Sequence, residues 1–354
     1  MKRIIFPSAI FFLLLLGISC KNATKKEPIA IADSSFVLPD VRPFAQAHAS
    51  TLTYLNNGDY LIAWFGGTKE KDDDVGIWLT QGNSKHWSAP IEIAKIREEP
   101  HWNPVLFRDE QDTIYLFFKV GKEIATWETW YIKSGDEGKS WSQATELVVA
   151  DRGGRGPVRN KPIVLSNGDW IAGASNEQGV WRPFVDISKD GGKTWNRSAY
   201  FEFNVERLGG EGMIQPTLWE SGDGQVHMLL RTSGGFIYRA DSKDYGQTWN
   251  KPYATSLPNP NSGIDLVKLD NGDLLLLYNP DQKNWGSRGD LHLAISKDNG
   301  TSWDDALILE HGDKEDEYSY PAIIQSDGVV ALTYTWNRSN IAFKRLILSK
   351  EDLK

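Results

Sequence analysis

The sequence predicts an all-β fold, a six-bladed β-propeller, from a repeated octapeptide and a repeated hairpin turn. The octapeptide has the pattern Ser-x-Asp-x-Gly-x-Thr/Ser-Trp, and a constant 54 residues separate the tryptophans of its copies, Trp141, Trp195, Trp249 and Trp303. One spacing earlier, a degenerate copy ends at Trp87. A repeat of this length suits a four-stranded blade. Because a lone blade cannot bury both of its faces, the blades must pack radially.

Turn signals flanked by apolar, β-branched and aromatic residues form the second periodic series. Each one predicts a hairpin that joins two strands. Six hairpins indicate six blades, and the last blade lacks an octapeptide because its tryptophan would fall beyond the chain end. The turn pairs are Asn57-Gly58, Asp112-Thr113, Asn167-Gly168, Asp223-Gly224, Asn271-Gly272 and Asp327-Gly328.

The composition of the 354-residue chain excludes several classes of protein. Hydrophobic residues make up 40%, which is enough to bury a core and excludes wholesale disorder. A net charge of −8, from 39 Lys plus Arg against 47 Asp plus Glu, argues against nucleic acid as a partner. The single cysteine excludes an internal disulfide and a cysteine-based zinc or iron–sulfur site.

The N-terminus predicts export. Lys2 and Arg3 precede an apolar stretch over 4–16 that is too short to span a bilayer comfortably. The residues before Cys20 resemble the lipobox of bacterial lipoproteins, although the usual leucine lies one place early, and an ordinary signal peptide is the alternative. We therefore expect a lipoprotein signal peptide over 1–20, a polar tether over 21–33 and the propeller over 34–354. Lipidation of Cys20 implies a membrane partner and a bacterial cell-envelope location, at the outer membrane and facing either the periplasm or the exterior.

The octapeptide resembles the Asp-box of sialidases and related bacterial neuraminidase repeats, and the resemblance covers the whole mature chain. It implies a sialidase-like propeller with the boxes at the outer edge, where they support the fold. The stretches HASTL, AWFGGT, WNPVLF, NKPI and SLPNPNSGIDLVKL are similar to a bacterial group of predicted neuraminidases. Fold alone does not fix the reaction.

The functional side chains are expected around the central channel, where each inner strand begins and each second strand ends. Every inner strand begins with a hydrogen-bonding or charged residue, which could otherwise be a channel filler satisfied by water. Cations gather at the same face, which favours an acidic sugar as ligand. The expected substrate-binding residues are Asn103, Lys119, Lys161, Gln215, Arg231 and Tyr320, with Trp130, Trp181, Trp285 and Trp336 available to stack on sugar rings.

Comparison with sialidases reveals departures at the arginine triad that grips the sialate carboxylate. His48 stands where the Phe-Arg-Ile-Pro motif has its arginine. Arg231 resembles the second arginine of the triad, and Asn279 replaces the third. The missing arginines put sialic acid itself in doubt.

Other residues match the sialidase pattern better. Tyr318, in Tyr-Ser, resembles the nucleophile, and Glu211 lies near the place of its acidic partner. The loop after the first hairpin offers Glu70 and Asp74 as proton donors. The expected catalytic residues are thus His48, Glu70, Asp74, Glu211 and Tyr318.

Three functions remain open. The first is an exo-acting glycoside hydrolase that removes a terminal, acidic sugar from an oligosaccharide or polysaccharide. The second is a lyase acting on uronic-acid glycans, in which His48 would help to move a proton. The third is a non-catalytic glycan-binding surface lipoprotein. We expect no cofactor and no bound metal, since no motif implies one, although the acidic run at 72–74 could hold Ca²⁺.

Overall fold

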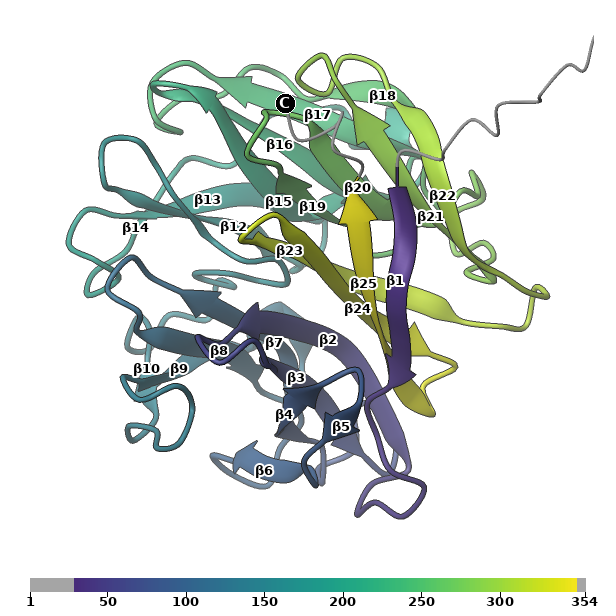
Figure 1. Cartoon of the computed structure of the whole chain (residues 1–354). Coiled ribbons are helices and arrows are strands. Elements are labelled where there is room, and N and C mark those ends of the chain that lie inside the picture. Colours follow the sequence, from purple (N-terminus) through teal and green to yellow (C-terminus); the bar gives the residue numbers. More distant parts are fainter. Residues whose placement is uncertain (1–28, 349–354) are drawn as a thin grey trace, which may run out of the picture.

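Six β-sheets are arranged around a central axis in the computed structural model, which describes residues 29–348 (Figure 1). The propeller expected from the repeats is confirmed. Blades 1 to 3 contain β2 (Gln46–Tyr54), β3 (Tyr60–Gly67), β4 (Gly76–Asn83), β5 (His86–Trp87) and β6 (Ile91–Ala94); β7 (His101–Arg108), β8 (Ile114–Val120), β9 (Glu128–Ser134) and β10 (Thr145–Glu146); and β11 (Ile163–Val164), β12 (Trp170–Asn176), β13 (Arg182–Ser188) and β14 (Asn196–Arg197).

Blades 4 and 5 repeat this antiparallel order, and blade 6 combines both ends of the chain. Two short 3₁₀ helices, η1 (Ile124–Thr126) and η2 (Val205–Leu208), lie in loops. No helix within residues 29–348 has the length and apolar character needed to cross a membrane. The strands of these blades are β15 (Met213–Gly222), β16 (Gln225–Thr232), β17 (Phe236–Ser242) and β18 (Tyr253–Pro258); β19 (Asp265–Lys268), β20 (Leu274–Tyr278), β21 (Asp290–Ser296) and β22 (Asp304–His311); and β23 (Tyr318–Ser326), β24 (Val329–Trp336), β25 (Asn340–Leu348) and β1 (Ile29–Phe36).

Strand β1 closes the ring by pairing with β25, so the first described strand is the outermost strand of the last blade (Figure 1). This explains why blade 6 has no octapeptide, since its fourth strand comes from the other end of the chain. It also corrects the domain boundary. The tether predicted over 21–33 extends too far, because Ile29 to Asp33 already belong to β1, and Ile29 is fully buried. The predicted signal peptide and Cys20 lie outside the described residues.

The hydrophobic core is divided among the interfaces between neighbouring blades, each of which holds one cluster of buried side chains. The octapeptide tryptophans belong to these interfaces. Trp195 of blade 3, for example, packs edge-on against Phe117 of blade 2, with ring centroids 6.3 Å apart. Each tryptophan therefore joins its blade to the preceding one, and burial of such a large ring contributes strongly to radial packing.

The inner strands share a bulge near the central channel. Residues Ala49, Asn103, Gln215, Asn261 and Tyr320 all have positive φ, between 41° and 58°. In four of these blades the pairing register shifts at the same place, for example between Ser319 and Ala322. A bulge re-aims the side chains at the start of a strand, and here it does so at the entrance to the channel.

Candidate functional site

A pocket of about 240 Å³ lies at the channel entrance. Each of the six blades contributes side chains to it, from its inner strand or from the loop after its second strand. Its wall is made by the inner-strand bulges and by the loops that follow each second strand. The lining residues are His48, Glu70, Lys71, Trp102, Asn103, Ile124, Trp127, Glu177, Trp181, Ile214, Gln215, Arg231, Trp285, Arg288, Tyr320 and Arg338.

Tyr320 lies at the centre of this arrangement. Its hydroxyl accepts a hydrogen bond of 2.7 Å from Nη1 of Arg231. Three guanidinium groups surround its ring, with carbon-to-centroid distances of 5.2 Å for Arg159, 5.6 Å for Arg231 and 5.9 Å for Arg288. The hydroxyl thus faces the pocket in a strongly cationic environment.

Arg231 is buried without an ion-pair partner among the described residues. Its side chain is held by neutral groups: Nε donates to Oδ1 of Asn261 at 2.8 Å, and Nη1 donates to Oε1 of Gln215 at 3.2 Å. Only 3% of the residue is exposed. Its charge acts on Glu177 and Glu211, but neither forms an ion pair with it, so this guanidinium can bind an anion from outside the protein.

Arg288 and Arg338 also line the pocket and share one carboxylate. Glu317 accepts from Nη1 of Arg288 at 3.1 Å and from Nε of Arg338 at 2.7 Å. Burial alone would raise the pKa of Glu317, but the neighbouring positive charges outweigh it and lower this pKa to about 2. Arg338 also pairs with Glu70 at 2.5 Å. Glu317 and Glu70 therefore hold these arginines in place.

Arg159 supplies a further buried cation directly behind Tyr320. Its Nη2 donates to the carbonyl oxygens of Tyr320 and Pro321 at 2.6 and 2.9 Å, and its Nε has no partner among the described residues. Burial lowers the pKa of Arg159 to about 10, so the group remains charged at neutral pH. It adds to the positive potential without touching the pocket.

His48 packs between the rings of Tyr320 and Phe65, at centroid distances of 4.4 and 5.4 Å. The residue is 2% exposed, and its Nδ1 has no hydrogen-bond partner among the described side chains and backbone groups. Burial, reinforced by the charge of Arg338, lowers the pKa of His48 well below its usual value. The imidazole is therefore neutral at physiological pH.

Glu177 lies in the pocket wall where β12 ends. Its Oε1 is shielded from solvent and makes no hydrogen bond of ordinary geometry in the described part of the chain, although the neighbouring Ser175 hydroxyl is close enough to lower the pKa of the carboxyl group. Burial raises the pKa of Glu177 to about 7, although the charges of Arg231 and Lys119 oppose the shift. A carboxyl group with this environment exchanges its proton near neutral pH.

Eight of the residues expected from the sequence meet in the pocket: His48, Glu70, Asn103, Gln215, Arg231 and Tyr320, with the stacking residues Trp181 and Trp285. The others lie elsewhere. Tyr318 belongs to the core between blades 5 and 6, with its ring 4.6 Å from that of Trp336, so Tyr320 is the pocket tyrosine. The bulge between Ser319 and Ala322 turns the side chain of Tyr318 to the core and that of Tyr320 to the pocket.

The carboxylates Asp74 and Glu211 are also displaced from the expected site. Asp74 accepts hydrogen bonds from the backbone N–H and hydroxyl of Thr68, at 2.9 and 2.7 Å, and thereby shapes its own loop. Glu211 accepts from Nε1 of Trp285 at 2.9 Å and from Nδ2 of Asn284 at 3.3 Å, so it supports the pocket wall from outside. Neither residue lines the pocket.

The two expected lysines are internal. Lys161 pairs with Asp265 at 2.9 Å and joins blades 3 and 5 within the channel. Lys119 is fully buried, where Nζ donates to Oγ1 of Thr129 at 2.7 Å and to the Arg155 carbonyl at 2.5 Å. Neither residue lines the pocket, so neither can grip a ligand there directly.

Arg288 and Glu317 were not among the expected residues. The sequence alignment of blades places Asn279 at the third arginine position, but Asn279 is buried and donates to the carbonyls of Asp290 and Tyr318. The long loop after β20 instead brings Arg288 into the pocket. The greater length of this loop, compared with its counterparts in the other blades, was the sequence feature that could have indicated Arg288.

The described residues contain no group of three or more His, Cys, Asp or Glu side chains suited to a metal ion. In the acidic run, Asp73 pairs with Lys122 at 3.1 Å. Asp74 is engaged by Thr68, as described above. The run therefore acts as a hydrogen-bonded loop.

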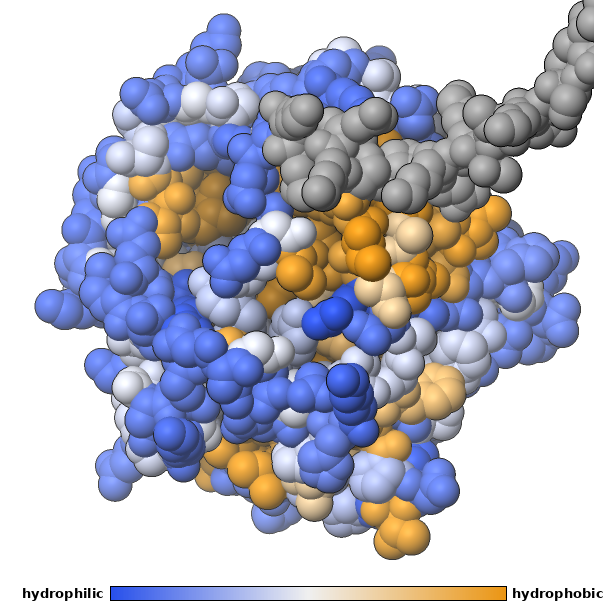
Figure 2. Space-filling model, viewed as in Figure 1, coloured by the Kyte–Doolittle hydropathy of each residue, from blue (hydrophilic) through white to orange (hydrophobic). Residues whose placement is uncertain are grey.

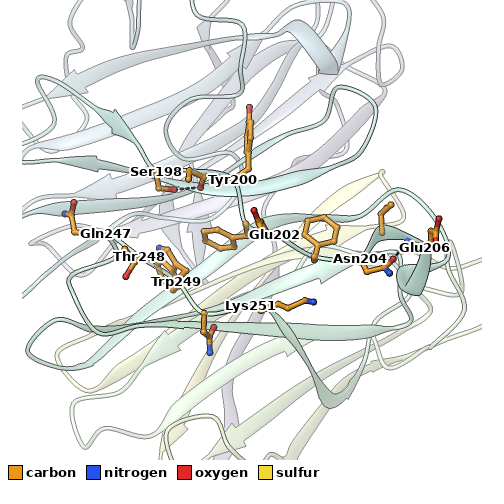
Figure 3. Close-up of a pocket in the computed structure, with 14 residues that line it drawn as sticks. Ser198, Tyr200, Glu202, Asn204, Glu206, Gln247, Thr248, Trp249 and Lys251 are labelled. Atoms are coloured by element: carbon orange, nitrogen blue, oxygen red, sulfur yellow. Dashed lines mark hydrogen bonds between the residues drawn. The ribbon is translucent and has the colours of Figure 1, made fainter.

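A larger cavity, of about 880 Å³, lies elsewhere, on the outer side between blades 3 and 4. Figure 2 shows a hollow with apolar walls on the side of the molecule where β13 and β16 lie. The 880 Å³ cavity is lined by two segments, 198–206 and 247–251, and the half-buried octapeptide residue Trp249 belongs to this lining (Figure 3). It lacks the converging arginines of the channel pocket, which therefore remains the candidate site despite its smaller volume.

A family model described as the BNR repeat-like domain matches residues 58–332. A sialidase of Bacteroides fragilis is 26% identical over 235 residues, which are 61% of this chain and 41% of that protein. A sialidase of Paraclostridium sordellii is 22% identical over 230 residues, 57% of this chain and 53% of that protein. The matches thus span about half the length of these curated relatives.

Solved structures show the same fold at low sequence identity. A protein of unknown function from Dyadobacter fermentans has a TM-score of 0.73 and 17% identity, and the match covers 91% of this chain and 100% of that chain. The K499G mutant of NanB sialidase from Streptococcus pneumoniae has a TM-score of 0.67 and 14% identity, with 90% and 71% covered. Trypanosoma rangeli sialidase in complex with 2,3-difluorosialic acid, described as a covalent intermediate, has a TM-score of 0.67 and 16% identity, with 89% and 56% covered.

Proposed function

The chain belongs to the BNR repeat-like domain family, and from its pocket we propose that it is an exo-acting glycoside hydrolase that removes a terminal acidic sugar. The buried Arg231, which lacks an ion-pair partner among the described residues, is the observation that carries this proposal. A sugar carboxylate would supply the missing negative charge, with Arg288 beside it. The sialidase relatives favour glycoside hydrolysis as the reaction class.

The size of the pocket supports an exo mode of action. Its volume of about 240 Å³ is below the usual range of roughly 300–1,000 Å³ for ligand pockets. A single sugar fits such a space better than an internal segment of a polysaccharide. Trp102, Trp127 and Trp285 provide apolar faces for the ring.

Tyr320 is the proposed nucleophile or stabiliser of the positive charge that develops at the anomeric carbon. Its hydroxyl points to the pocket and is fixed by Arg231. Departure of the leaving group makes the sugar oxocarbenium-like, and a lone pair of the phenolic oxygen at this place can stabilise it. A bond from that oxygen to the anomeric carbon requires the hydroxyl to give up its proton, which the neutral imidazole of His48 against the ring could accept and later return. Water then completes the hydrolysis.

One observation favours a lyase as the second candidate. Neutral His48 lies against Tyr320, and a neutral imidazole beside a tyrosine can remove and return protons during β-elimination from a uronate. The products distinguish the reactions. A hydrolase adds the mass of water, whereas a lyase leaves an unsaturated sugar that absorbs ultraviolet light.

The test is incubation of the purified full-length protein with sialylated glycans, uronate-capped arabinogalactan fragments and sulfated algal fragments. Release of an acidic monosaccharide with water added supports the proposal, and Arg231→Met should abolish that release. Release of an unsaturated product favours the lyase. Binding without any product overturns both reactions and leaves glycan recognition.

We also propose that the enzyme is a lipoprotein anchored to the bacterial envelope through Cys20. The apolar segment at 4–16 and the following cysteine support this location. Metabolic labelling with a fatty acid should mark the wild type, and Cys20→Ala should abolish both the label and membrane fractionation. A wild-type protein that carries no lipid overturns this part of the proposal.

A further inference from the structure

The pocket of the proposed hydrolase needs a group that can give a proton to the departing oxygen, and the sequence-based candidates do not supply it. Glu70 is engaged by Arg338 at 2.5 Å. Asp74 is occupied by Thr68 and does not line the pocket. The protonatable group must therefore be sought elsewhere in the wall.

Glu177 has the required position. It follows β12 in blade 3, and Arg288 and Arg338 come from the walls formed by blades 5 and 6. Its Oε1 is buried and makes no hydrogen bond of ordinary geometry within residues 29–348, with the Ser175 hydroxyl as its polar neighbour. Glu177 lines the pocket, and a shielded, unsatisfied oxygen favours the protonated form of its carboxyl group, since leaving a buried charge without a hydrogen bond costs free energy.

We propose that Glu177 is the general acid and base of the pocket, with Lys119 as the positioning residue that tunes it. This assignment rests on the proposed hydrolase function. The Glu177 carboxyl gives its proton to the glycosidic oxygen while the bond from that oxygen to the anomeric carbon breaks, and the bonding electron pair stays on the oxygen. The resulting carboxylate then takes a proton from the water that attacks the anomeric carbon, which restores the carboxyl group and completes the hydrolysis.

The electrostatic surroundings agree with this role. Burial raises the pKa of Glu177 to about 7, against the opposing charges of Arg231 on β16 and Lys119 on β8. Glu70, Lys71, Arg288 and Arg338 face the pocket from the other loops. A general acid works best when its pKa lies close to the working pH, since it must both hold and release its proton.

Lys119 is placed to tune Glu177 without touching the substrate. It is fully buried, its Nζ is fixed by Thr129 and the Arg155 carbonyl, and burial lowers its pKa to about 7. Its charge lowers the pKa of Glu177, while Asp186 and, to a smaller extent, Glu177 and Asp151 favour the charged form of the lysine and Arg155 opposes it.

The test compares Glu177→Gln with wild type on two substrates that carry the same acidic sugar. One is the natural fragment cleaved in the panel above, and the other is the corresponding 4-nitrophenyl glycoside, whose leaving group needs little protonation. Glu177→Gln should lower kcat on the natural fragment by about 10²- to 10⁴-fold and leave most of the activity on the nitrophenyl substrate. The alkaline fall of the wild-type pH profile, near pH 7, should disappear.

Glu70→Gln is the matched control, because it makes the same chemical change to another pocket carboxylate. Glu70→Gln should lower the activity on both substrates to the same extent, because it loses the contact with Arg338. If Glu177→Gln lowers kcat on both substrates to the same extent, or changes kcat on neither, the assignment of Glu177 is wrong while the hydrolase function stands. If wild type cleaves no member of the panel, the proposed function fails and this assignment with it. Thermal melting of each variant separates these results from misfolding, and Glu177→Asp should recover part of the activity.

Discussion

The outer turns of the propeller and its inner rim occupy equivalent places in successive blades, yet only the outer turns repeat their residues. Asp136, Asp190 and Asp298 each accept hydrogen bonds from the serine or threonine four residues later, which lowers their pKa values to about 2. These interactions are completed within one turn. The same hydrogen bonds recur in every complete octapeptide.

The inner rim uses one backbone conformation to present different side chains. Asn103, Gln215 and Tyr320 share the left-handed bulge, but their partners lie in other blades. Buried groups that make no hydrogen bond of ordinary geometry, such as Oε1 of Glu177, lie here as well. Residues that repeat from blade to blade and complete their hydrogen bonds within one turn therefore support the fold. Positions where the side chain varies and polar groups lack partners indicate the candidate site.

The largest expected effect contrasts two tyrosines that are neighbours in sequence. Tyr320→Phe should lower kcat on the cleaved fragment by about 10²-fold or more, because it removes the pocket hydroxyl. Tyr318→Phe removes a hydroxyl outside the pocket and should change kcat less than about threefold. Steady-state kinetics of both variants check this. An equal fall of kcat in the two variants would contradict the assignment of Tyr320, and not Tyr318, to the pocket.

Arg231→Met should separate binding from stability. Loss of a buried charged contact to the ligand should weaken binding by about 2–5 kcal/mol, whereas replacement of an unpaired buried charge by an apolar group should maintain or raise the melting temperature. Calorimetric titration with the released monosaccharide and thermal unfolding measure the two effects. A large fall in melting temperature with unchanged affinity would show that Arg231 is a structural residue.

Trp195→Ala should produce the opposite pattern at the outer edge. Trp195 is 6% exposed and joins blades 2 and 3, so its truncation should cost about 3–5 kcal/mol of unfolding free energy. Activity measured well below the melting temperature should be retained, since the pocket lies at the channel. Denaturant unfolding with an activity assay tests this. Loss of activity in the folded variant would mean that the outer turns affect the site.

The smallest effects concern the pH dependence set by Glu177 and Lys119. The folded-state pKa of Glu177 is raised, so its ionisation destabilises the fold increasingly as the pH rises from about 4.5 to about 7. Glu177→Gln should therefore gain about 1–3 kcal/mol relative to wild type above pH 7. Unfolding measured at pH 4 and pH 8 checks this. A pH-independent difference between the two proteins would contradict the raised pKa.

Lys119→Met should move the alkaline limb of activity to higher pH, because the lysine charge lowers the pKa of Glu177. The hydrogen bond from Thr129 to the Arg155 carbonyl, at 2.6 Å, still satisfies that carbonyl in the variant. The pH profile of kcat measures the shift. A profile that keeps its limb while kcat falls uniformly would assign Lys119 to packing alone.

The amino-acid sequence by itself determined the six blades, because the interactions that define each repeat are local. An octapeptide closes its hydrogen bonds within four residues, and each hairpin pairs strands that are adjacent in the chain. The inner-rim positions could be found for the same reason. The closing strand β1 was missed because its pairing with β25 joins opposite ends of the chain.

Tertiary structure decided which of the candidate residues meet in one pocket. Tyr318 and Tyr320 would point the same way on a regular strand, and only the bulge directs one to the core and the other to the channel. Arg288 reaches the site through a loop that is longer than its counterparts in the other blades. The coupling of Glu177 with Lys119 depends on how blades 2 and 3 pack. Burial and long-range charge, which a sequence pattern does not encode, make these residues chemically distinct from others of their type.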